Sequence, residues 1–368
     1  MTKIEIYSDQ FNIVGPGGQH RILNVADGLA KMGYNVLLIT PFFRTTYNDL
    51  LKNPNKYYID TKRLYFTVKG KLMYYLGNST ILPLATSCGN PGIVVLPSPI
   101  FKANVAVIKK ACRDIVIADF GDIYFSQNDP YAYKLISSMY LDVILTKYVD
   151  YVIVPTRKML MFFQKLMPHL SSKVIHIPSS INTSIFKPNN PTPNPTIAYI
   201  GALTPGRGVE LLPAIIKETV KYISDAEFII IGSGPLEGYL KRAIARFGLS
   251  SHARFMGDVD YWDIPKVCRG CWIGLSLYPR ESIYPVDILK ALTYMSLGMP
   301  IVSSVDIEEA EGAAIKVKYS VDEFLRAIIE LVRNDELRLT ISHKARYIAI
   351  NKYDNNIITK RYISLFNK

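Results

Sequence analysis

The chain has 368 residues, 49% of them hydrophobic and 20% charged, a globular balance at a length that suggests two domains and excludes a disordered chain, a collagen and a coiled-coil rod. No apolar run reaches the ~18 residues that a membrane-spanning helix needs, and four cysteines are too few for a disulfide scaffold. The N-terminus has the pattern of a first strand rather than that of a signal peptide. We therefore expect a cytoplasmic protein. The formal net charge is +12, and residues 1–190 carry +10 of it.

Short apolar strands alternate with amphipathic helices along the first half of the chain. Apolar residues recur at helical spacing from Gln19 to Met32, and short apolar runs bounded by turn residues predict buried strands. The expected strands are Ile4–Tyr7, Val36–Ile39, Ile93–Leu96, Ile115–Ala118, Tyr151–Val154 and Val174–Ile177, and the expected helices are Gln19–Met32, Lys102–Cys112, Tyr131–Lys147 and Arg157–Met167.

A proline-rich segment separates this half from the second. Residues Lys187–Pro195 include four prolines in nine residues, which excludes a helix interior and a central strand and predicts a stiff, extended linker. The alternation then resumes. The expected strands are Thr196–Ile200, Glu227–Ile231, Ala253–Met256, Ile273–Leu277 and Ile301–Ser304, and the expected helices are Val209–Tyr222, Leu236–Phe247, Asp287–Ser296 and Val321–Arg333.

Nearly continuous apolar strands indicate parallel sheets that are covered on both faces. With right-handed crossovers, the fold class is α/β with two doubly wound domains, residues 1–187 and 196–350, joined by a linker at 188–195. We expect residues 351–368 to form a helix that crosses back to the first domain. Ligands of such sheets bind at the carboxyl ends of the strands.

Three glycine-rich turns follow strands, at Val14–Gln19, Gly201–Gly208 and Gly232–Pro235. Backbone N–H groups at such turns bind anions, and glycine lets a phosphate approach the backbone. The second turn holds Arg207, whose guanidinium suits a diphosphate. The first and third turns are equally well explained as tight connections, and a solvated surface residue is the less favoured interpretation of Arg207. None has the GxGxxG of a dehydrogenase, and the first lacks the Lys-Ser/Thr of a P-loop.

Two further motifs differ in what they indicate. Lys290 and Thr293 are three residues apart and share one face of the helix expected at Asp287–Ser296. Cys268 and Cys271 form a lone CxxC that leads into an apolar strand, which favours a buried helix end over a zinc site with its four ligands. The five histidines show no metal-ligand spacing, so we expect no metal and no other cofactor.

Six segments in order carry a family resemblance: the early glycine loop with "GYNVLLIT", then "VIHIPSSINTSIFKP", "YIGALTPGRGVELLPAI", "IIGSGP", "RFMGDV" and "LTYMSLGMPIV". Together they resemble the GT-B glycosyltransferases, which have two Rossmann-like domains facing a cleft, and within them the retaining family 4. The resemblance covers essentially the whole chain. It implies a metal-independent enzyme that transfers a sugar from a nucleotide-diphosphate donor with retention of configuration.

The resemblance also implies roles for individual residues. Gly17 and Gly18 face the donor phosphate from the first domain, and Arg207 stands where the family usually has a lysine that binds the leaving diphosphate. The remaining donor-side positions border the nucleotide or its sugar. They are Gly201, Gly232, Gly234, Glu281, Lys290 and Thr293.

Three positions depart from the family pattern. Ala202 replaces an arginine, and Thr293 replaces a glutamate that grips the ribose, for which Glu281 is a candidate substitute. Gly121 stands at a histidine position, so the acceptor-side role falls to Asp122 or Asp119, and Asp122 is preferred. These departures keep open an alternative function, a catalytically impaired binding subunit of a glycosylation complex.

The charge of the first half suggests an anionic partner. Lys52–Lys71 is basic and aromatic, with Asp60 as its one acidic residue, and suits an anionic membrane surface or a lipid-linked acceptor. An ordinary solvated hairpin explains it as well. The expected partners are a nucleotide-sugar donor and a glycan or lipid-linked acceptor, with peripheral membrane attachment as an option, and no nucleic acid.

Overall fold

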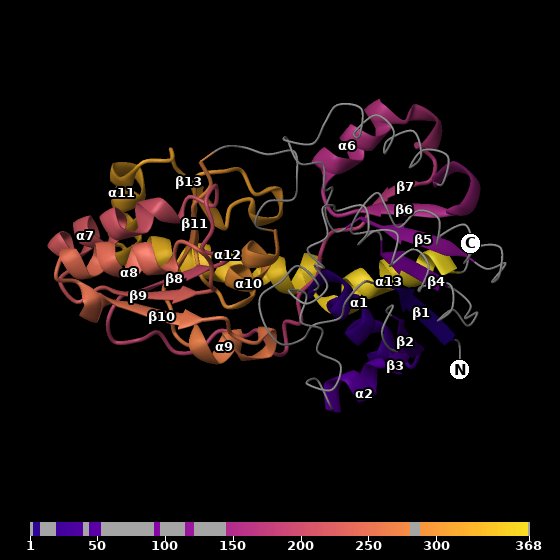
Figure 1. The fold of residues 1–368 in the computed structure, drawn as a ribbon, viewed down its shortest axis with the longest axis horizontal. Helices are drawn as coiled ribbons and strands as arrows, with labels where there is room; N and C mark the ends of the chain where they lie inside the picture. The colour runs from indigo at the N-terminus through magenta and orange to yellow at the C-terminus, as the bar shows by residue number, and fades with distance from the viewer. Residues whose placement is uncertain are drawn as a thin grey trace, which may run out of the picture.

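The computed structural model describes residues 3–7, 20–39, 44–52, 92–95, 115–120, 145–279 and 288–366. These residues form two sheets, one of seven strands in the first half of the chain and one of six strands in the second. Helices lie against both sheets, and the two sheet units lie side by side along the long axis of the molecule (Figure 1).

The first sheet has the strand order β3-β2-β1-β4-β5-β6-β7. Its strands are β1 (Lys3–Tyr7), β2 (Asn35–Ile39), β3 (Arg44–Thr46), β4 (Gly92–Val95), β5 (Val116–Asp119), β6 (Tyr151–Val154) and β7 (Val174–His176). The helices described around it are α1 (His20–Lys31), α2 (Tyr47–Lys52), α6 (Arg157–Leu166) and, from the end of the chain, α13 (Asn355–Phe366).

The second sheet has the order β10-β9-β8-β11-β12-β13. Its strands are β8 (Thr196–Ile200), β9 (Glu227–Ile231), β10 (Ala253–Gly257), β11 (Ile273–Ser276), β12 (Ile301–Ser303) and β13 (Ala314–Lys316). Its helices are α7 (Leu212–Tyr222), α8 (Glu237–Arg246), α9 (Ile264–Val267), α10 (Ile288–Ser296), α11 (Val321–Arg333) and α12 (Asp335–Tyr353).

In both sheets the first strand lies beside the fourth. The order in which successive strands are added therefore changes sides at this pair, as it does in doubly wound α/β sheets. The predicted α/β class with two doubly wound sheets is therefore confirmed. One detail differs, because the short edge strand β3 pairs with β2 in the antiparallel direction, with Leu37 opposite Thr46. The sequence analysis did not predict this three-residue strand. The expected helix Lys102–Cys112 and most of Tyr131–Lys147 lie outside the described residues.

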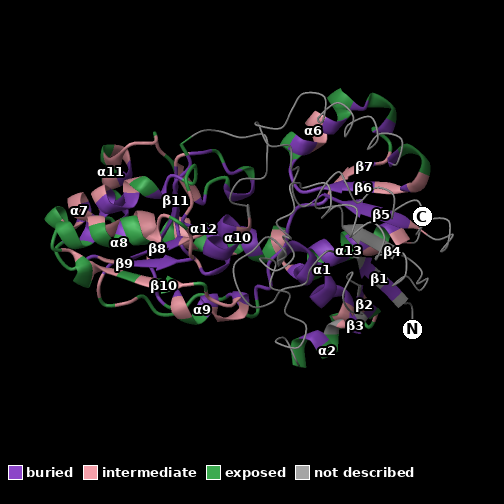
Figure 2. Cartoon of the chain, in the orientation of Figure 1, coloured by how far each residue is buried: buried purple, intermediate pink, exposed green. Residues whose placement is uncertain are grey.

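Strand residues alternate between two apolar layers, as the period of two requires. In the first sheet, Ile117 and Ile153 pack with α1 and α13, while Ala118 and Val152 face the layer under α6. In the second sheet, Ile197 faces α7 and α11, whereas its neighbour Ala198 faces the layer of α10 and α12. Buried residues accordingly line both sheets (Figure 2).

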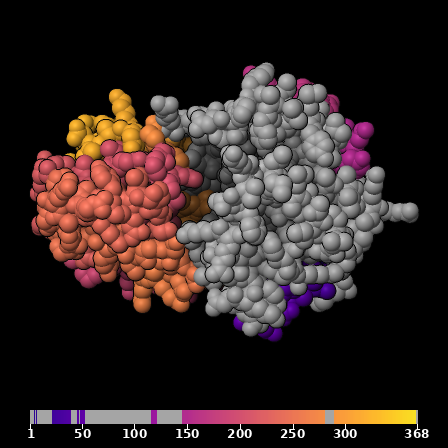
Figure 3. All heavy atoms as spheres, in the orientation of Figure 1, coloured from indigo at the N-terminus to yellow at the C-terminus, as the bar shows by residue number. Residues whose placement is uncertain are grey.

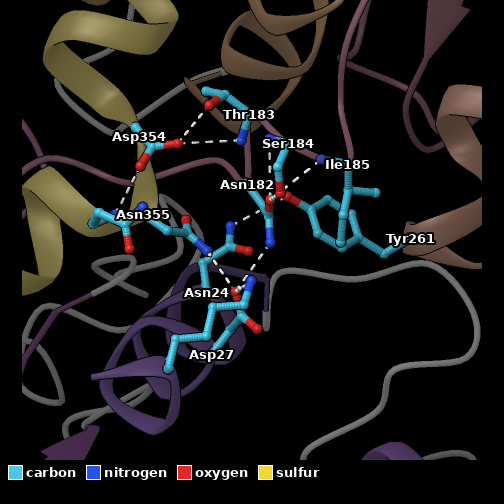
Figure 4. A network of polar contacts seen from close by, with 11 residues as sticks. Asn24, Asp27, Asn182, Thr183, Ser184, Ile185, Tyr261, Asp354 and Asn355 are labelled. Atoms are coloured by element: carbon cyan, nitrogen blue, oxygen red, sulfur yellow. Dashed lines mark hydrogen bonds and ion pairs between the residues drawn. The ribbon is translucent and has the colours of Figure 1, made fainter. Parts of the chain in front are cut away.

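The chain passes between the two units twice, and the two passages touch. The first follows β7, and the second is the break between α12 and α13 at Asp354. Ile181 donates its N–H to the Tyr353 carbonyl at 2.9 Å and accepts from the Asn355 N–H at 3.0 Å. Thr183 Oγ1 also donates to the Asp354 carboxylate at 2.5 Å (Figure 4). The two passages therefore form one joint.

The proline-rich segment lies beyond this joint and packs on the second sheet. Thr192 donates its N–H to the Gly270 carbonyl at 2.9 Å, and its own carbonyl accepts from the Trp272 indole at 3.0 Å. Arg346 on α12 holds the preceding residues by donating to the carbonyl oxygens of Thr183 and Phe186 at 2.9 and 2.7 Å. These contacts all hold residues 183–192 against the second unit.

Candidate functional site

The strand order of the second sheet places a candidate site at the carboxyl ends of β8 and β11. These two strands pair in parallel at the point where the order of successive strands changes sides. Ligands of doubly wound sheets bind in the crevice at this point. The loops that follow them begin at Gly201 and Leu277. In the space-filling view, the surface of the second unit borders a hollow at the middle of the molecule (Figure 3).

Two of the glycine turns are joined to each other. Gly201 N–H donates to the Ile231 carbonyl and Leu203 N–H donates to the Ser233 carbonyl, both at 2.9 Å. Gly232 has a φ of 125°, and a Cβ at this position would lie 2.1 Å from the Gly201 carbonyl oxygen. Glycine is therefore required at Gly232 by backbone packing, whatever a ligand demands. A Cβ at Gly234 would similarly lie 2.4 Å from the Leu203 carbonyl oxygen.

Two cationic side chains converge on one tyrosine at this edge. Arg207 extends from the turn after β8, is exposed, and donates from its guanidinium to the Tyr278 hydroxyl. Lys290 comes from the first turn of α10 and is buried at 9% exposure. Its Nζ lies 4.5 Å from the ring centre of Tyr199 and 5.6 Å from that of Tyr278. Aromatic faces stabilise a buried ammonium group in this geometry.

Lys290 also fills space beside the first glycine of the turn. Its Nζ would lie 3.3 Å from a Cβ built on Gly201. The neighbouring position is Ala202, which the resemblance identified as a lost arginine. The structure thus brings together Gly201, Arg207 and Lys290, with the turn of Gly232 and Gly234 hydrogen-bonded to their loop.

Thr293 lies one turn after Lys290 on α10, at 4% exposure. Its hydroxyl donates to the Leu289 carbonyl of the same helix at 2.8 Å. This bond uses the hydroxyl hydrogen, so towards any other group the hydroxyl can act only as an acceptor. Four candidate residues lie outside the described part of the chain. They are Gly17, Gly18, Asp122 and Glu281.

The described residues include one of the two acceptor-side aspartates, Asp119. Asp119 ends β5 and is buried at 1% exposure. It accepts from Arg21 Nε at 2.9 Å and from the Tyr362 hydroxyl at 2.5 Å. A carboxylate held in this way is not available to a substrate, so Asp119 has a structural role and Asp122 keeps the acceptor-side hypothesis.

Tyr278 and Tyr199 are components of the donor-side edge that the sequence pattern does not predict. Tyr278 precedes the candidate Glu281 by three residues, but a tyrosine at a strand end carries no ligand signal of its own. Position in the fold supplies that signal, because Tyr199 lies in β8 and Tyr278 follows β11. Cys268 and Cys271 are buried just after α9, which confirms the predicted buried helix end.

Two general features of the described residues bear on function. They include no group of three or more His, Cys, Asp or Glu side chains that could hold a metal ion. Among the same residues, none of the helices is both long enough and apolar enough to span a membrane.

The architecture is that of the GT-B glycosyltransferases, as comparison with solved structures shows. HepE of Anabaena, solved in complex with UDP, superimposes with a TM-score of 0.70 at 13% identity and covers 100% of both chains. TarM of Staphylococcus aureus, solved with Fondaparinux, α-GlcNAc-glycerol and UDP, has a TM-score of 0.70 at 12% identity over 100% of both chains. At these identities the likeness concerns the fold.

Residues 194–334, which include the whole candidate site of the second sheet, match the family described as Glycosyl transferases group 1. This part of the chain is therefore similar to that family. An uncharacterized glycosyltransferase of Haemophilus influenzae is 24% identical over 92% of this chain and 93% of its own length. Poly(ribitol-phosphate) α-N-acetylglucosaminyltransferase of S. aureus is 24% identical over 46% of this chain and 35% of its own.

Proposed function

We propose that the protein is a retaining glycosyltransferase that moves a hexose-type sugar from a nucleotide-diphosphate donor to a glycan or lipid-linked acceptor, without a catalytic metal. The donor binds the second unit at the carboxyl ends of β8 and β11, and the acceptor binds the first unit. The observation that carries the proposal is the convergence of Arg207 and Lys290 on Tyr278 at this edge.

Breaking the bond between sugar and diphosphate places negative charge on the leaving group. Fixed positive groups stabilise that charge without solvent reorganisation, because they are already oriented before the reaction. Arg207 presents a planar fork that matches two phosphate oxygens, while the ammonium group of Lys290 is held between two aromatic rings. Lys290 thereby compensates for the arginine that Ala202 lacks, which supports catalysis over the alternative of an impaired binding subunit.

The relatives support the nucleotide part of this proposal. HepE and TarM were both solved with UDP, and the matched S. aureus enzyme transfers N-acetylglucosamine to a poly(ribitol-phosphate). A uridine nucleotide is therefore the first donor to test. On the first unit, Asp122 is the proposed acceptor-side group, with Gly17 and Gly18 facing the donor phosphate and Glu281 near the ribose.

A ligand-dependent melting experiment tests the donor site. A ligand that binds only the folded protein raises its melting temperature with concentration, so a panel of nucleoside diphosphates and nucleotide-sugars identifies the donor. Release of nucleoside diphosphate from that donor then measures turnover. If no nucleotide-sugar shifts the melting temperature of the wild-type protein, the proposed donor site is wrong.

Arg207→Ala is the key variant, with Arg246→Ala as its control, because Arg246 is an exposed arginine at the far end of α8. Losing one group that stabilises the leaving charge typically lowers the rate by about a hundredfold or more. We expect that loss in Arg207→Ala, an unchanged melting temperature without ligand, and wild-type turnover in Arg246→Ala. Unchanged turnover in Arg207→Ala would remove this residue from the site.

The acceptor side is tested separately. Vesicles containing anionic lipid should sediment the protein at low salt and release it at high salt, whereas neutral vesicles should leave it in solution. The basic residues to neutralise together are Lys62, Arg63, Lys69 and Lys71, which lie outside the described residues.

Retention is tested by comparing the anomeric configuration of donor and product by NMR. Metal independence is tested by measuring turnover in the presence of a chelator.

A further inference from the structure

Three side chains from distant parts of the sequence meet in the interior of the first unit. Arg21 lies on the first turn of α1, Asp119 ends β5, and Tyr362 comes from the return helix α13. Their exposed fractions are 5%, 1% and 0%. Residues separated by 98 and 341 positions from Arg21 thus share one buried polar cluster.

The three side chains form a closed ring of hydrogen bonds. Arg21 Nε donates to Asp119 Oδ1 at 2.9 Å, Arg21 Nη2 donates to the Tyr362 hydroxyl at 2.9 Å, and that hydroxyl donates to Asp119 Oδ2 at 2.5 Å. The rest of the guanidinium bonds the first passage between the units, at the Ser179 hydroxyl (3.2 Å) and the Ile177 carbonyl (2.8 Å). Both carboxylate oxygens therefore have a donor.

The electrostatics agree with an ionised pair. Burial alone would lower the pKa of Arg21, but the Asp119 carboxylate and Tyr362 together raise it above its ordinary value. Burial and the same carboxylate raise the pKa of Tyr362 well above its ordinary value, so its hydroxyl keeps the proton that it donates to Asp119. Tyr362 is consequently the one neutral member, and it bridges both charges.

Two members of the cluster lie close in sequence to residues of the proposed active site. Arg21 follows Gly17 and Gly18 by a few residues, and Asp119 precedes Asp122 by three. The described segments next to these candidates, the start of α1 and the end of β5, thus each contain a residue that contacts Tyr362. A side chain from α13 therefore links the start of α1 to the end of β5.

We propose that Tyr362 is a positioning residue for the half of the active site that the first unit contributes. This inference rests on the proposed function. Tyr362 touches no substrate. Its hydroxyl fixes the orientation of the Asp119 carboxylate against Arg21, and thereby the carboxyl end of β5 and the start of α1. Donor binding by the second unit does not depend on it.

Tyr362→Phe tests the proposal, because it removes the bridging hydroxyl and keeps the aromatic ring and the ion pair. The control is Tyr347→Phe on α12, where the tyrosine is 65% exposed. Hydrogen exchange of the folded protein is the first readout. We expect the amides of Ile117–Phe120 and of the first turn of α1 to exchange at least tenfold faster in Tyr362→Phe only. Unchanged exchange there, or an equal increase in every element, would overturn the proposal.

Kinetics with the nucleotide-sugar found by the melting panel are the second readout. We expect Tyr362→Phe to lower kcat about tenfold with the donor KM and the UDP dissociation constant within twofold of wild type. A rise in donor KM with unchanged kcat would contradict a positioning role. If the wild-type protein turns over no nucleotide-sugar, the proposed function fails, and the exchange experiment still decides whether Tyr362 positions these segments.

A milder variant keeps the proposal testable if Tyr362→Phe does not fold. Ser179→Ala removes one acceptor from Arg21 Nη1 and leaves every bond to Asp119 in place. We expect it to speed exchange at the start of α1 but not at the end of β5. The same pattern at both places would mean that the cluster responds as a packed unit and that the hydroxyl of Tyr362 has no separate role.

Discussion

The first helix after the first strand is built differently in the two sheets, although both sheets have the same strand order. On α1 the buried face includes Arg21, Asn24 and Asp27. On α7 it consists of Leu212, Pro213, Ile215, Ile216 and Thr219. The helix α1 adds directional hydrogen bonds to its apolar packing, whereas α7 relies mainly on apolar packing.

The partners of the two helices explain the difference. The helix α7 packs against α8 and α11 of its own sheet unit, where non-directional burial is enough. The helix α1 contacts both passages of the chain: Asn24 donates to the Ser180 carbonyl and the Tyr261 hydroxyl, and Asp27 accepts from Asn182 and Asn355 (Figure 4). Segments so distant in sequence need bonds that define one geometry, and buried polar networks supply them.

The largest expected effect comes from breaking the α1 network at its ion pair. Asp119→Ala leaves the Arg21 guanidinium buried without its carboxylate, and removing one partner of a buried pair costs about 3–5 kcal/mol. Urea denaturation should show this loss in the free energy of unfolding. Asp225→Ala, at an exposed aspartate after α7, should change it by less than about 0.5 kcal/mol. Equal effects of the two substitutions would show that α1 gains nothing from its ion pair.

A buried carboxyl group in the second unit provides the contrasting case. Glu309 is 5% exposed, and burial raises its pKa to about 7. Because the folded protein keeps this proton while the unfolded chain releases it near pH 4.5, the free energy of unfolding should fall between about pH 4.5 and pH 7. A shift of this size corresponds to on the order of 3 kcal/mol. Glu309→Gln should remove that slope.

Urea denaturation at pH 5 and pH 7.5 measures the difference. Glu311→Gln is the matched control, since Glu311 is exposed two residues further along the chain, and it should keep the wild-type slope. An unchanged slope in Glu309→Gln would mean that other groups cause the pH dependence.

A third prediction concerns the close approach of α1 and the return helix. A Cβ on Gly28 would lie 1.9 Å from Thr359 Oγ1 and 2.9 Å from its Cβ. Gly28→Ala should therefore lower stability by about 1–3 kcal/mol, the usual cost of overpacking. Gly238→Ala on α8 meets only the end of the Arg242 side chain at 3.3 Å, and should instead raise stability by up to about 1 kcal/mol, because alanine favours helix. Thermal denaturation that gives both variants the same sign would contradict the packing argument.

The smallest effect is expected inside α7. The Thr219 hydroxyl is buried without a hydrogen-bond partner among the described residues, so Thr219→Val should be neutral or stabilising by about 1 kcal/mol. The same exchange at Thr156, whose hydroxyl accepts from the Met159 N–H at 3.0 Å and caps α6, should destabilise by about 1 kcal/mol. Melting temperatures that move in the same direction would argue against this difference between the two hydroxyls.

The predictability of the fold follows the strength of the local pattern. The runs Thr196–Ile200 and Glu227–Ile231 and the helix Val321–Arg333 have the predicted bounds, because long apolar runs and helical periodicity are determined within the segment itself. Strands β3 (Arg-Thr-Thr) and β13 (Ala-Ile-Lys) contain no run of β-branched apolar residues, unlike the equally short β7 and β12. Strands without such a run form only because a neighbouring strand is present to pair with them.

The site shows the same limit. The glycine turns and Arg207 are visible in the sequence because the turns need particular residues. Tyr278 becomes relevant only when β8 and β11 are adjacent, which the sequence does not display. Arg21, Asn24 and Asp27 recur every three residues in α1, where residues 22–30 are otherwise apolar or glycine. That spacing was the one available signal for a buried polar face.

The return helix has a consequence for how the chain folds during synthesis. Ile358, Tyr362 and Leu365 complete the apolar layer that contains Ile4 and Ile22, so the first of the two sheets to leave the ribosome is completed by a segment that is made after the second sheet. Domains usually fold in the order of their synthesis. Here the second sheet can complete its layers before the first, and a chain that stops short of α13 would expose the face of α1 that carries both its charges and its apolar side chains.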